Sequence, residues 1–173
     1  MKLAVIGSGN IGKSIGGWAS KAGYEVIFSS RNEQHALEAA KITGKNSRAG
    51  SIKDAVEKAD IVLLAVPYGA VKDILTDLGT RLNGKVLVDV TNPLSPDFSS
   101  LTLGFSTSAA EEIQKLVPGA KVVKAFNTIF AAVYDAQNPI IKGGKISVFF
   151  AADDKDAKNK VADLISKKAC AAK

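Results

Sequence analysis

Short apolar runs alternate with amphipathic segments along the whole chain of 173 residues. The runs are continuously apolar, as in strands buried on both faces of a parallel sheet, and the amphipathic segments have the period of helices. Strands are expected over residues 3–6, 25–29, 48–50, 60–66, 85–90, 121–125 and 145–151. Helices are expected over residues 10–21, 33–41, 52–58, 71–82, 108–116 and 155–167.

Capping residues support several of these helix starts. Ser51 stands before the third expected helix, and Ser108 with Glu111 forms a capping-box pattern before the fifth. Asp154 can cap the last helix in the same way. The regular alternation predicts βαβ units and a single doubly wound α/β domain over residues 1–173. Right-handed crossovers would place the first strand centrally, with a binding crevice at its carboxyl end.

Composition and charge narrow the class of partner. The chain is 46% hydrophobic and 23% charged, which is ordinary for a globular domain. Its formal net charge is +6, but the lysines and arginines are scattered and only 6% of residues are aromatic, so no nucleic-acid partner is expected. No apolar run approaches the ~20 residues of a membrane span, so no membrane partner is expected either. The lone Cys170 and the lack of a signal-peptide pattern favour a cytoplasmic protein.

The first expected strand ends in GSGNIG (residues 7–12), a complete G-x-G-x-x-G pattern between a strand and a helix. In that context the pattern is typical of a dinucleotide-binding Rossmann turn. Gly7 permits the tight turn, Gly9 lets the backbone approach a pyrophosphate, and Gly12 lets the helix pack against the strand. The amides and the dipole of the helix start then face the phosphates.

The end of the second expected strand points to the particular dinucleotide. An NAD site usually has an acidic residue there, which binds the ribose hydroxyls. This chain has Ser29, Ser30, Arg31 and Asn32 instead. Two hydroxyls can donate to a 2′-phosphate, and an arginine fork can bind that phosphate bidentately and stack on adenine. The pattern predicts an NADP site, but an ordinary strand-to-helix turn with an N-cap stays open as the alternative.

Five segments together resemble the coenzyme F420-dependent NADP oxidoreductases, also called NADPH:F420 reductases. They are MKLAVIGSGNIGKSIGGWASKAGYEVIFSSRN, ADIVLLAVPYGAV, VLVDVTNPL, VVKAFNT and VFFAADDKDAKNKVADLIS, in this order. The first segment is shared by many Rossmann dehydrogenases, whereas the ordered set is much more specific. The resemblance implies an oxidoreductase that uses NADP(H) and coenzyme F420.

The resemblance also implies roles for residues at the carboxyl ends of the expected strands, where such sheets bind ligands. The residues implied at the pyrophosphate are Gly7, Ser8, Gly9, Asn10 and Ile11, with Gly12 beside them. Those implied at the 2′-phosphate are Ser30 and Arg31, next to Ser29. Those implied around the ribose, nicotinamide and acceptor are Ala65, Val66, Pro67, Asn92, Pro93, Asn127 and Thr128. A turn or scaffold role stays open for Asn92-Pro93 and Asn127.

The resemblance departs at the C-terminal end. Members of the family continue with a further strand and a helical segment that helps to cover the deazaflavin, whereas this sequence ends at Lys173. Either the chain is truncated relative to the family or its acceptor site is more open, so the resemblance determines the identity of the acceptor less than it determines NADP binding. Residues 126–173 are expected to form the acceptor-side portion of the domain.

Hydride transfer between two planar rings needs positioning and no side-chain acid or base. His35 is the only histidine and is expected on a helix surface, so no catalytic residue and no metal site are predicted. Lys124, Tyr68 and Tyr134 stay open as proton donors.

The favoured hypothesis is an enzyme that transfers a hydride between NADP(H) and F420, or a flavin as the second choice. One alternative is an NADP-binding redox-sensing module without turnover. Another is an imine- or ketone-reducing enzyme completed by a partner subunit. An open crevice would gain cover from a second copy, which makes a homodimer a candidate assembly.

Overall fold

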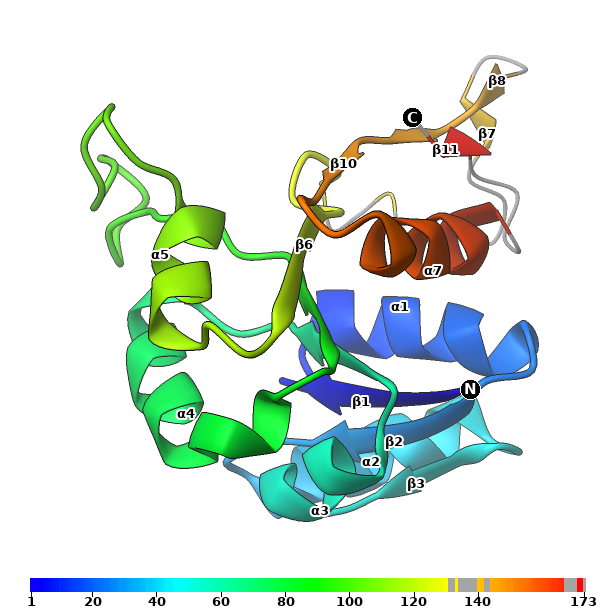
Figure 1. The fold of residues 1–173 in the computed structure, drawn as a ribbon. Helices are drawn as coiled ribbons and strands as arrows, with labels where there is room; N and C mark the ends of the chain where they lie inside the picture. The colour runs from blue at the N-terminus through cyan, green and yellow to red at the C-terminus, as the bar shows by residue number, and fades with distance from the viewer. Residues whose placement is uncertain (131–132, 134–139, 142–143, 167–170, 173) are drawn as a thin grey trace.

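The computed structural model describes residues 1–130, 133, 140–141, 144–166 and 171–172 (Figure 1). Among them, seven strands form one sheet in the order β10-β6-β5-β4-β1-β2-β3. These strands are β1 (Lys2–Ile6), β2 (Glu25–Ser29), β3 (Ser47–Ala49), β4 (Ile61–Leu64), β5 (Val86–Asp89), β6 (Lys121–Ala125) and β10 (Phe150–Ala151). All neighbours are parallel except β10, which is antiparallel to β6. The first strand therefore lies inside the parallel sheet, as the crossover rule predicts.

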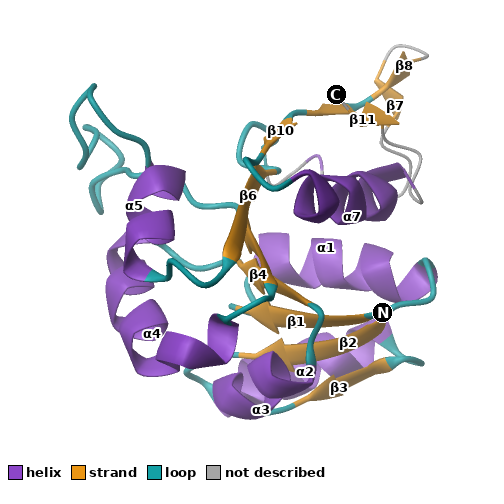
Figure 2. Ribbon diagram, in the orientation of Figure 1, coloured by secondary structure: helices purple, strands orange, loops and turns teal. Residues whose placement is uncertain are grey.

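Helices cover both faces of this sheet, and Figure 2 shows α1 and α7 on one side and α4 and α5 on another. The helices that share one apolar layer are α1 (Asn10–Lys21), α2 (Glu33–Thr43) and α7 (Lys155–Ser166). Those that share the other are α3 (Ile52–Lys58), α4 (Val71–Leu78) and α5 (Ala109–Leu116). Two 3-10 helices, η1 (Tyr68–Ala70) and η2 (Gly79–Leu82), flank α4. The doubly wound α/β fold in a single domain is confirmed.

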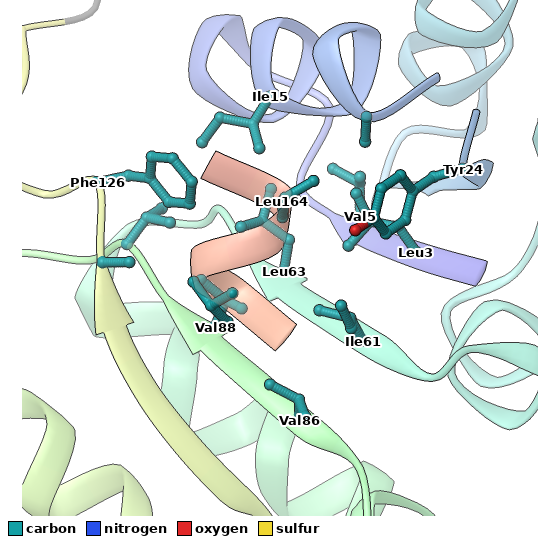
Figure 3. Close-up of a cluster of buried hydrophobic side chains, with 14 of the residues drawn as sticks. Leu3, Val5, Ile15, Tyr24, Ile61, Leu63, Val86, Val88, Phe126 and Leu164 are labelled. Atoms are coloured by element: carbon teal, nitrogen blue, oxygen red, sulfur yellow. The ribbon is translucent and has the colours of Figure 1, made fainter. Parts of the chain in front are cut away.

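The core lies in two apolar layers, one on each face of the sheet. Leu3 and Val5 of β1 point toward α1, in the layer that also contains Leu164 of α7 (Figure 3). Ala4 and Ile6 of the same strand point into the opposite layer. Because both faces are covered, the strands are apolar at successive positions, which is the pattern seen in the sequence.

Two expected elements differ in kind from the structure, whereas the others agree to within two residues at each end. The helix expected over 71–82 ends at Leu78 and continues as η2, because Gly79 has a φ of +49° that does not extend an α-helix. The strand expected over 145–151 is divided into β8 (Gly144–Lys145), β9 (Ser147–Val148) and β10. β8 pairs with β7 (Ile140–Ile141), β9 with β11 (Ala171–Ala172), and β10 with β6, so no single sheet holds the whole segment.

Capping chemistry set the helix starts as expected. The Ser51 side chain accepts from the Asp54 N–H, and Ser108 and Glu111 form a complete capping box. Asp154 Oδ1 accepts the Ala157 N–H at 2.7 Å at the start of α7.

Candidate functional site

The glycine turn joins β1 to α1 at the carboxyl edge of the sheet. Gly7 has a φ of +99°, and its N–H donates to the Ser29 carbonyl oxygen at 2.9 Å. A Cβ on Gly7 would lie 2.1 Å from the Ala65 carbonyl oxygen, and one on Gly12 would lie 1.9 Å from the Gly7 carbonyl oxygen. The fold itself therefore requires glycine at both positions.

Gly9 has a different reason to be glycine. Its φ of −74° and ψ of −173° suit any residue, and a Cβ there would meet nothing within 4 Å. The fold would accept a side chain at this position, which also lines a cleft. A bare peptide surface in a cleft fits a pyrophosphate that contacts backbone amides.

The first turn of α1 offers its amides to a ligand. Its N-cap residue has no capping side chain, and the turn contains no acidic residue. The neighbouring α2, by contrast, is capped by Asn32, whose side chain accepts the Gln34 N–H at 3.0 Å. Uncapped amides at a helix start carry partial positive charge, so Asn10 and Ile11 lie where an anion is stabilised.

A cleft of about 200 Å³ brings the predicted segments together. Its lining residues are Ile6, Gly7, Ser8, Gly9, Ser30, Arg31, Ile52, Ala65, Val66, Pro67, Ala70 and Ile74. The parallel register of β1 with β2 and β4 places the three strand ends side by side. The segments predicted to hold the pyrophosphate, the 2′-phosphate and the ribose therefore border one cleft.

The end of β2 has a buried part and an exposed part. Ser29 is fully buried and its hydroxyl donates to the Val5 carbonyl oxygen at 3.0 Å. Ser29 does not line the cleft, so the structure corrects the expectation that its hydroxyl reaches a phosphate, since that hydroxyl ties β2 to β1. The Ser8 hydroxyl donates to the Ser29 carbonyl oxygen at 3.3 Å. Arg31 is exposed in the cleft beside Ser30, with no ion pair to a described residue, and is available to an anion.

An amide bridge joins the carboxyl ends of β5 and β6. The Asn92 side chain donates to the Asn127 carbonyl oxygen at 3.2 Å, and the Asn127 side chain donates to Asn92 Oδ1 at 3.2 Å. Phe126, directly before Asn127, has a φ of +66°. That conformation costs a non-glycine residue about 1–2 kcal/mol, so the surrounding contacts must hold it in place. Thr128 is exposed and lines neither the cleft nor the larger cavity beside the amide bridge.

A larger cavity of about 820 Å³ lies next to this bridge. Asn92, Pro93 and Asn127 line it from the strand ends, and Lys124 lines it from within β6. Residues 101–105 contribute from the long loop after β5, except for Thr102. Of the residues predicted around the nicotinamide and acceptor, Asn92, Pro93 and Asn127 therefore border a second, roomier cavity.

Sequence reasoning missed one buried ionic contact near that cavity. Asp89 ends β5 with no exposed surface, and its Oδ2 accepts from Lys124 Nζ at 2.8 Å. The signal was a charged residue that closes an apolar strand run. Its partner could not be assigned because the pairing depends on the register of β5 against β6, in which Asp89 stands opposite Lys124.

The remaining candidate side chains lie elsewhere. His35 is exposed on α2 and outside the cleft. Tyr68 lines a separate pocket of about 340 Å³ against α4 and α5. Burial raises the pKa of its phenol, and the charges of Glu112 and Asp89 add to that rise. Tyr134 falls outside the described residues.

Neither a cluster of candidate metal ligands nor a membrane-spanning helix occurs in the described part of the chain. No group of three or more His, Cys, Asp or Glu side chains there could hold a metal ion. Within the same ranges, no helix is both long and apolar enough to cross a bilayer.

A glycine-rich turn that opens a helix at the switch point of a parallel 3-2-1-4-5-6 sheet defines a nucleotide-binding Rossmann domain. Residues 2–93 match the family described as "NADP oxidoreductase coenzyme F420-dependent". The chain belongs to this family.

Relatives and solved structures agree with that assignment. The chain is 31% identical to the F420-dependent NADP reductase of Methanothermobacter thermautotrophicus, over 96% of this chain and 77% of the relative. A hypothetical protein from Sinorhizobium meliloti superposes with a TM-score of 0.88 at 35% identity, over 100% of this chain and 83% of that one. A putative F420-dependent NADP reductase from Arthrobacter sp. FB24 gives a TM-score of 0.86 at 30% identity, over 99% and 83%.

Proposed function

We propose that this protein transfers a hydride between NADP(H), held in the cleft of about 200 Å³, and coenzyme F420. One observation carries the assignment of the dinucleotide: the uncapped glycine turn borders the same cleft as Arg31, which makes no ion pair with a described residue. An acidic residue, which would repel a 2′-phosphate, is absent from residues 29–32 at the end of β2. Membership of the family and a relative named F420-dependent NADP reductase support the acceptor.

The proposed contacts follow the lining of the cleft. The peptide of Gly9 and the first amides of α1 would hold the pyrophosphate, with Ser8 in the turn. Ser30 and Arg31 would bind the 2′-phosphate, the arginine through two parallel hydrogen bonds. Residues 65–67 would border the ribose and nicotinamide from the end of β4.

The chemistry asks little of the side chains. When bound, the reduced nicotinamide supplies the hydride that the acceptor receives. The protein holds the two rings at reacting distance and keeps water away, which accounts for much of the rate in such reactions. Apolar side chains of Ile6, Val66 and Ile74 line the cleft, and the bridge between Asn92 and Asn127 fixes the separation of two strand ends.

The acceptor is proposed to lie on the side of Asn92, Asn127 and the cavity of about 820 Å³, within the portion formed by residues 126–173 and the loop after β5. Phe130 and Phe149 are 84% and 60% exposed in that portion, and a second copy would cover them in a homodimer. We also propose a cytoplasmic location and no nucleic-acid partner, supported by the single cysteine and the scattered basic residues.

The test is transfer of deuterium from NADPH labelled at nicotinamide C4 to F420, followed by mass spectrometry of the reduced F420, which keeps the label on carbon. Reduction of a free flavin, whose N5–D would exchange with water, is followed in parallel by the loss of the absorbance of the oxidised flavin. Label on F420 is expected. Reduction of the flavin without label on F420 would make the flavin the acceptor and keep the reaction class. Tight NADP binding with neither label on F420 nor reduction of the flavin would overturn the assignment as an enzyme and favour a redox-sensing module.

A further inference from the structure

The side chains of Asp89 and Lys124 bond the backbone of Thr91, the residue before Asn92. Asp89 Oδ1 accepts the Thr91 N–H at 2.8 Å, and Asp89 Oδ2 accepts from Lys124 Nζ at 2.8 Å. Lys124 Nζ also donates to the Thr91 carbonyl oxygen. One carboxylate and one ammonium group therefore hold both backbone polar groups of a single residue.

Asp89 and Lys124 make these contacts at the point where strand pairing ends. The paired registers of β5 with β4 and with β6 both stop at Asp89, which stands opposite Leu64 and Lys124. Thr91 lies two residues further and is only 3% exposed. Its N–H and C=O groups would be buried without a strand partner, which is unfavourable unless other groups bond them. The pair of Asp89 and Lys124 supplies those bonds.

Stability alone does not account for a charged pair at this position. Asp89 has no exposed surface and the Lys124 side chain is 22% exposed, so both groups lose most of their hydration. Apolar residues of similar volume usually stabilise a buried position as well as an ion pair does, or better. What the pair adds is direction, because Asp89 Oδ1 accepts the Thr91 N–H and Lys124 Nζ donates to the Thr91 carbonyl oxygen.

The contacts converge on the reacting end of the proposed site. Thr91 leads into Asn92, whose side chain forms the bridge to Asn127, two residues after the end of β6. Lys124 lies three residues before Asn127, with the left-handed Phe126 between them, and lines the cavity of about 820 Å³ together with both asparagines. The buried pair of Asp89 and Lys124 and the more exposed bridge of Asn92 and Asn127 therefore both connect the end of β5 to the end of β6.

We infer that Asp89 and Lys124 are positioning residues for hydride transfer: by holding the Thr91 backbone they place Asn92 and Pro93 beside the nicotinamide. The inference rests on the proposed function. It predicts that loss of the pair slows the chemical step more than it weakens NADP binding, because the pyrophosphate and 2′-phosphate contacts are made at the ends of β1 and β2.

The main variant is the double substitution Asp89→Leu with Lys124→Met, which removes both charges and leaves no unpaired buried ion. Lys124→Arg is the conservative variant, since it keeps a cation and its donors. Lys121→Met is the matched control. Lys121 begins β6, at the end of the strand opposite Asn127, and pairs with Asp154 at 3.0 Å. Thermal melting of each protein establishes that it is folded.

Single-turnover transfer from NADPH and the Kd for NADP are measured on each folded protein. We expect the double variant to transfer hydride roughly 10- to 100-fold more slowly, as for a misplaced reactive ring, with a Kd close to that of the wild type. Lys124→Arg should recover part of the rate, and Lys121→Met should change neither quantity. A folded double variant with the wild-type rate would overturn the inference. So would an equal loss of rate and of affinity.

A second measurement keeps this inference separate from the proposed function. If the wild type transfers hydride to neither F420 nor a flavin, the proposed function fails, and amide hydrogen exchange of residues 90–92 then tests whether the pair holds this segment. Faster exchange confined to this segment in the double variant supports the positioning of Thr91. Unchanged exchange there means that the pair does not hold the segment, and overturns the inference.

Discussion

Substitution of Gly9 by alanine should separate ligand binding from folding. A Cβ at this position meets nothing within 4 Å, and the φ of −74° is allowed for alanine. Alanine in place of glycine restricts the unfolded chain, which stabilises a protein by about 0.4–1 kcal/mol. Alanine is, however, a poorer N-cap than glycine, by roughly 0.5–1 kcal/mol. The two effects oppose each other, so the free energy of unfolding should stay within about 0.5 kcal/mol of the wild-type value.

Binding of NADP should respond very differently to Gly9→Ala. The added methyl group would stand between the peptide and the pyrophosphate, and overpacking of one methyl group costs about 1–3 kcal/mol. That corresponds to a Kd roughly 5- to 150-fold weaker. Calorimetric titration with NADP measures the affinity, and urea unfolding without ligand measures the stability.

Gly17→Ala is the control for Gly9→Ala on the same helix. Its Cβ would lie 3.9 Å from Thr43 Oγ1, which is an ordinary contact, and it faces away from the cleft lining. Alanine in a helix interior is favoured over glycine by about 0.5–1 kcal/mol, so this variant should gain stability with an unchanged Kd. A Gly9→Ala protein that binds NADP as tightly as the wild type would contradict the proposed contact. So would a large loss of stability in Gly9→Ala, which is expected only where the fold requires glycine, as at Gly12.

Three further outcomes are expected. Arg31→Asp should weaken NADP binding far more than NAD binding in parallel titrations, because Arg31 lines the cleft without a carboxylate partner among the described residues. Equal loss of affinity for both would mean that Arg31 does not contact the 2′-phosphate. Thr91→Val should raise the melting temperature, since the Thr91 hydroxyl is buried and has no hydrogen-bond partner in the described part of the chain. An unpaired buried hydroxyl costs about 1–3 kcal/mol. A lower melting temperature would show that the hydroxyl is bonded. Burial, with the hydrogen bond to Asp163, raises the pKa of Tyr24 from 10.0 to about 12. The folded state therefore favours the neutral phenol, and its contribution to stability should be complete below pH 10.0 and decline as the pH rises toward about 12. Urea unfolding across this range should show the decline in the wild type and a flatter profile in Tyr24→Phe, and identical profiles would contradict the pKa.

Local patterns in the sequence predicted most of the elements. The boundaries of α1, β2, α3 and β6 agree with the structure to the residue. These elements are marked by their own residues: caps at helix starts, glycine after helix ends, and apolar runs of strand length. The prediction was wrong where pairing partners decide, as over 145–151, which three different strand pairs divide.

The candidate site shows the same division. The glycine turn and the Ser30-Arg31 corner could be predicted because their chemistry lies within short stretches of chain. The environment of each side chain could not. Ser29 looked like a phosphate ligand beside Ser30, yet the alternation along β2 turns its hydroxyl toward Val5 and out of the cleft.

By itself, then, the sequence determined the order of strands and helices and the dinucleotide turn, and it indicated a phosphorylated ribose, since each depends on residues close together in the chain. Only the tertiary structure decided that a Cβ at Gly9 would meet open space, that two cavities border the strand ends, and that Asp89 holds Thr91 together with Lys124. The last contact joins residues 35 positions apart through the register of two parallel strands. Such a register is set by the packing of both sheet faces, and no local pattern of residues encodes it.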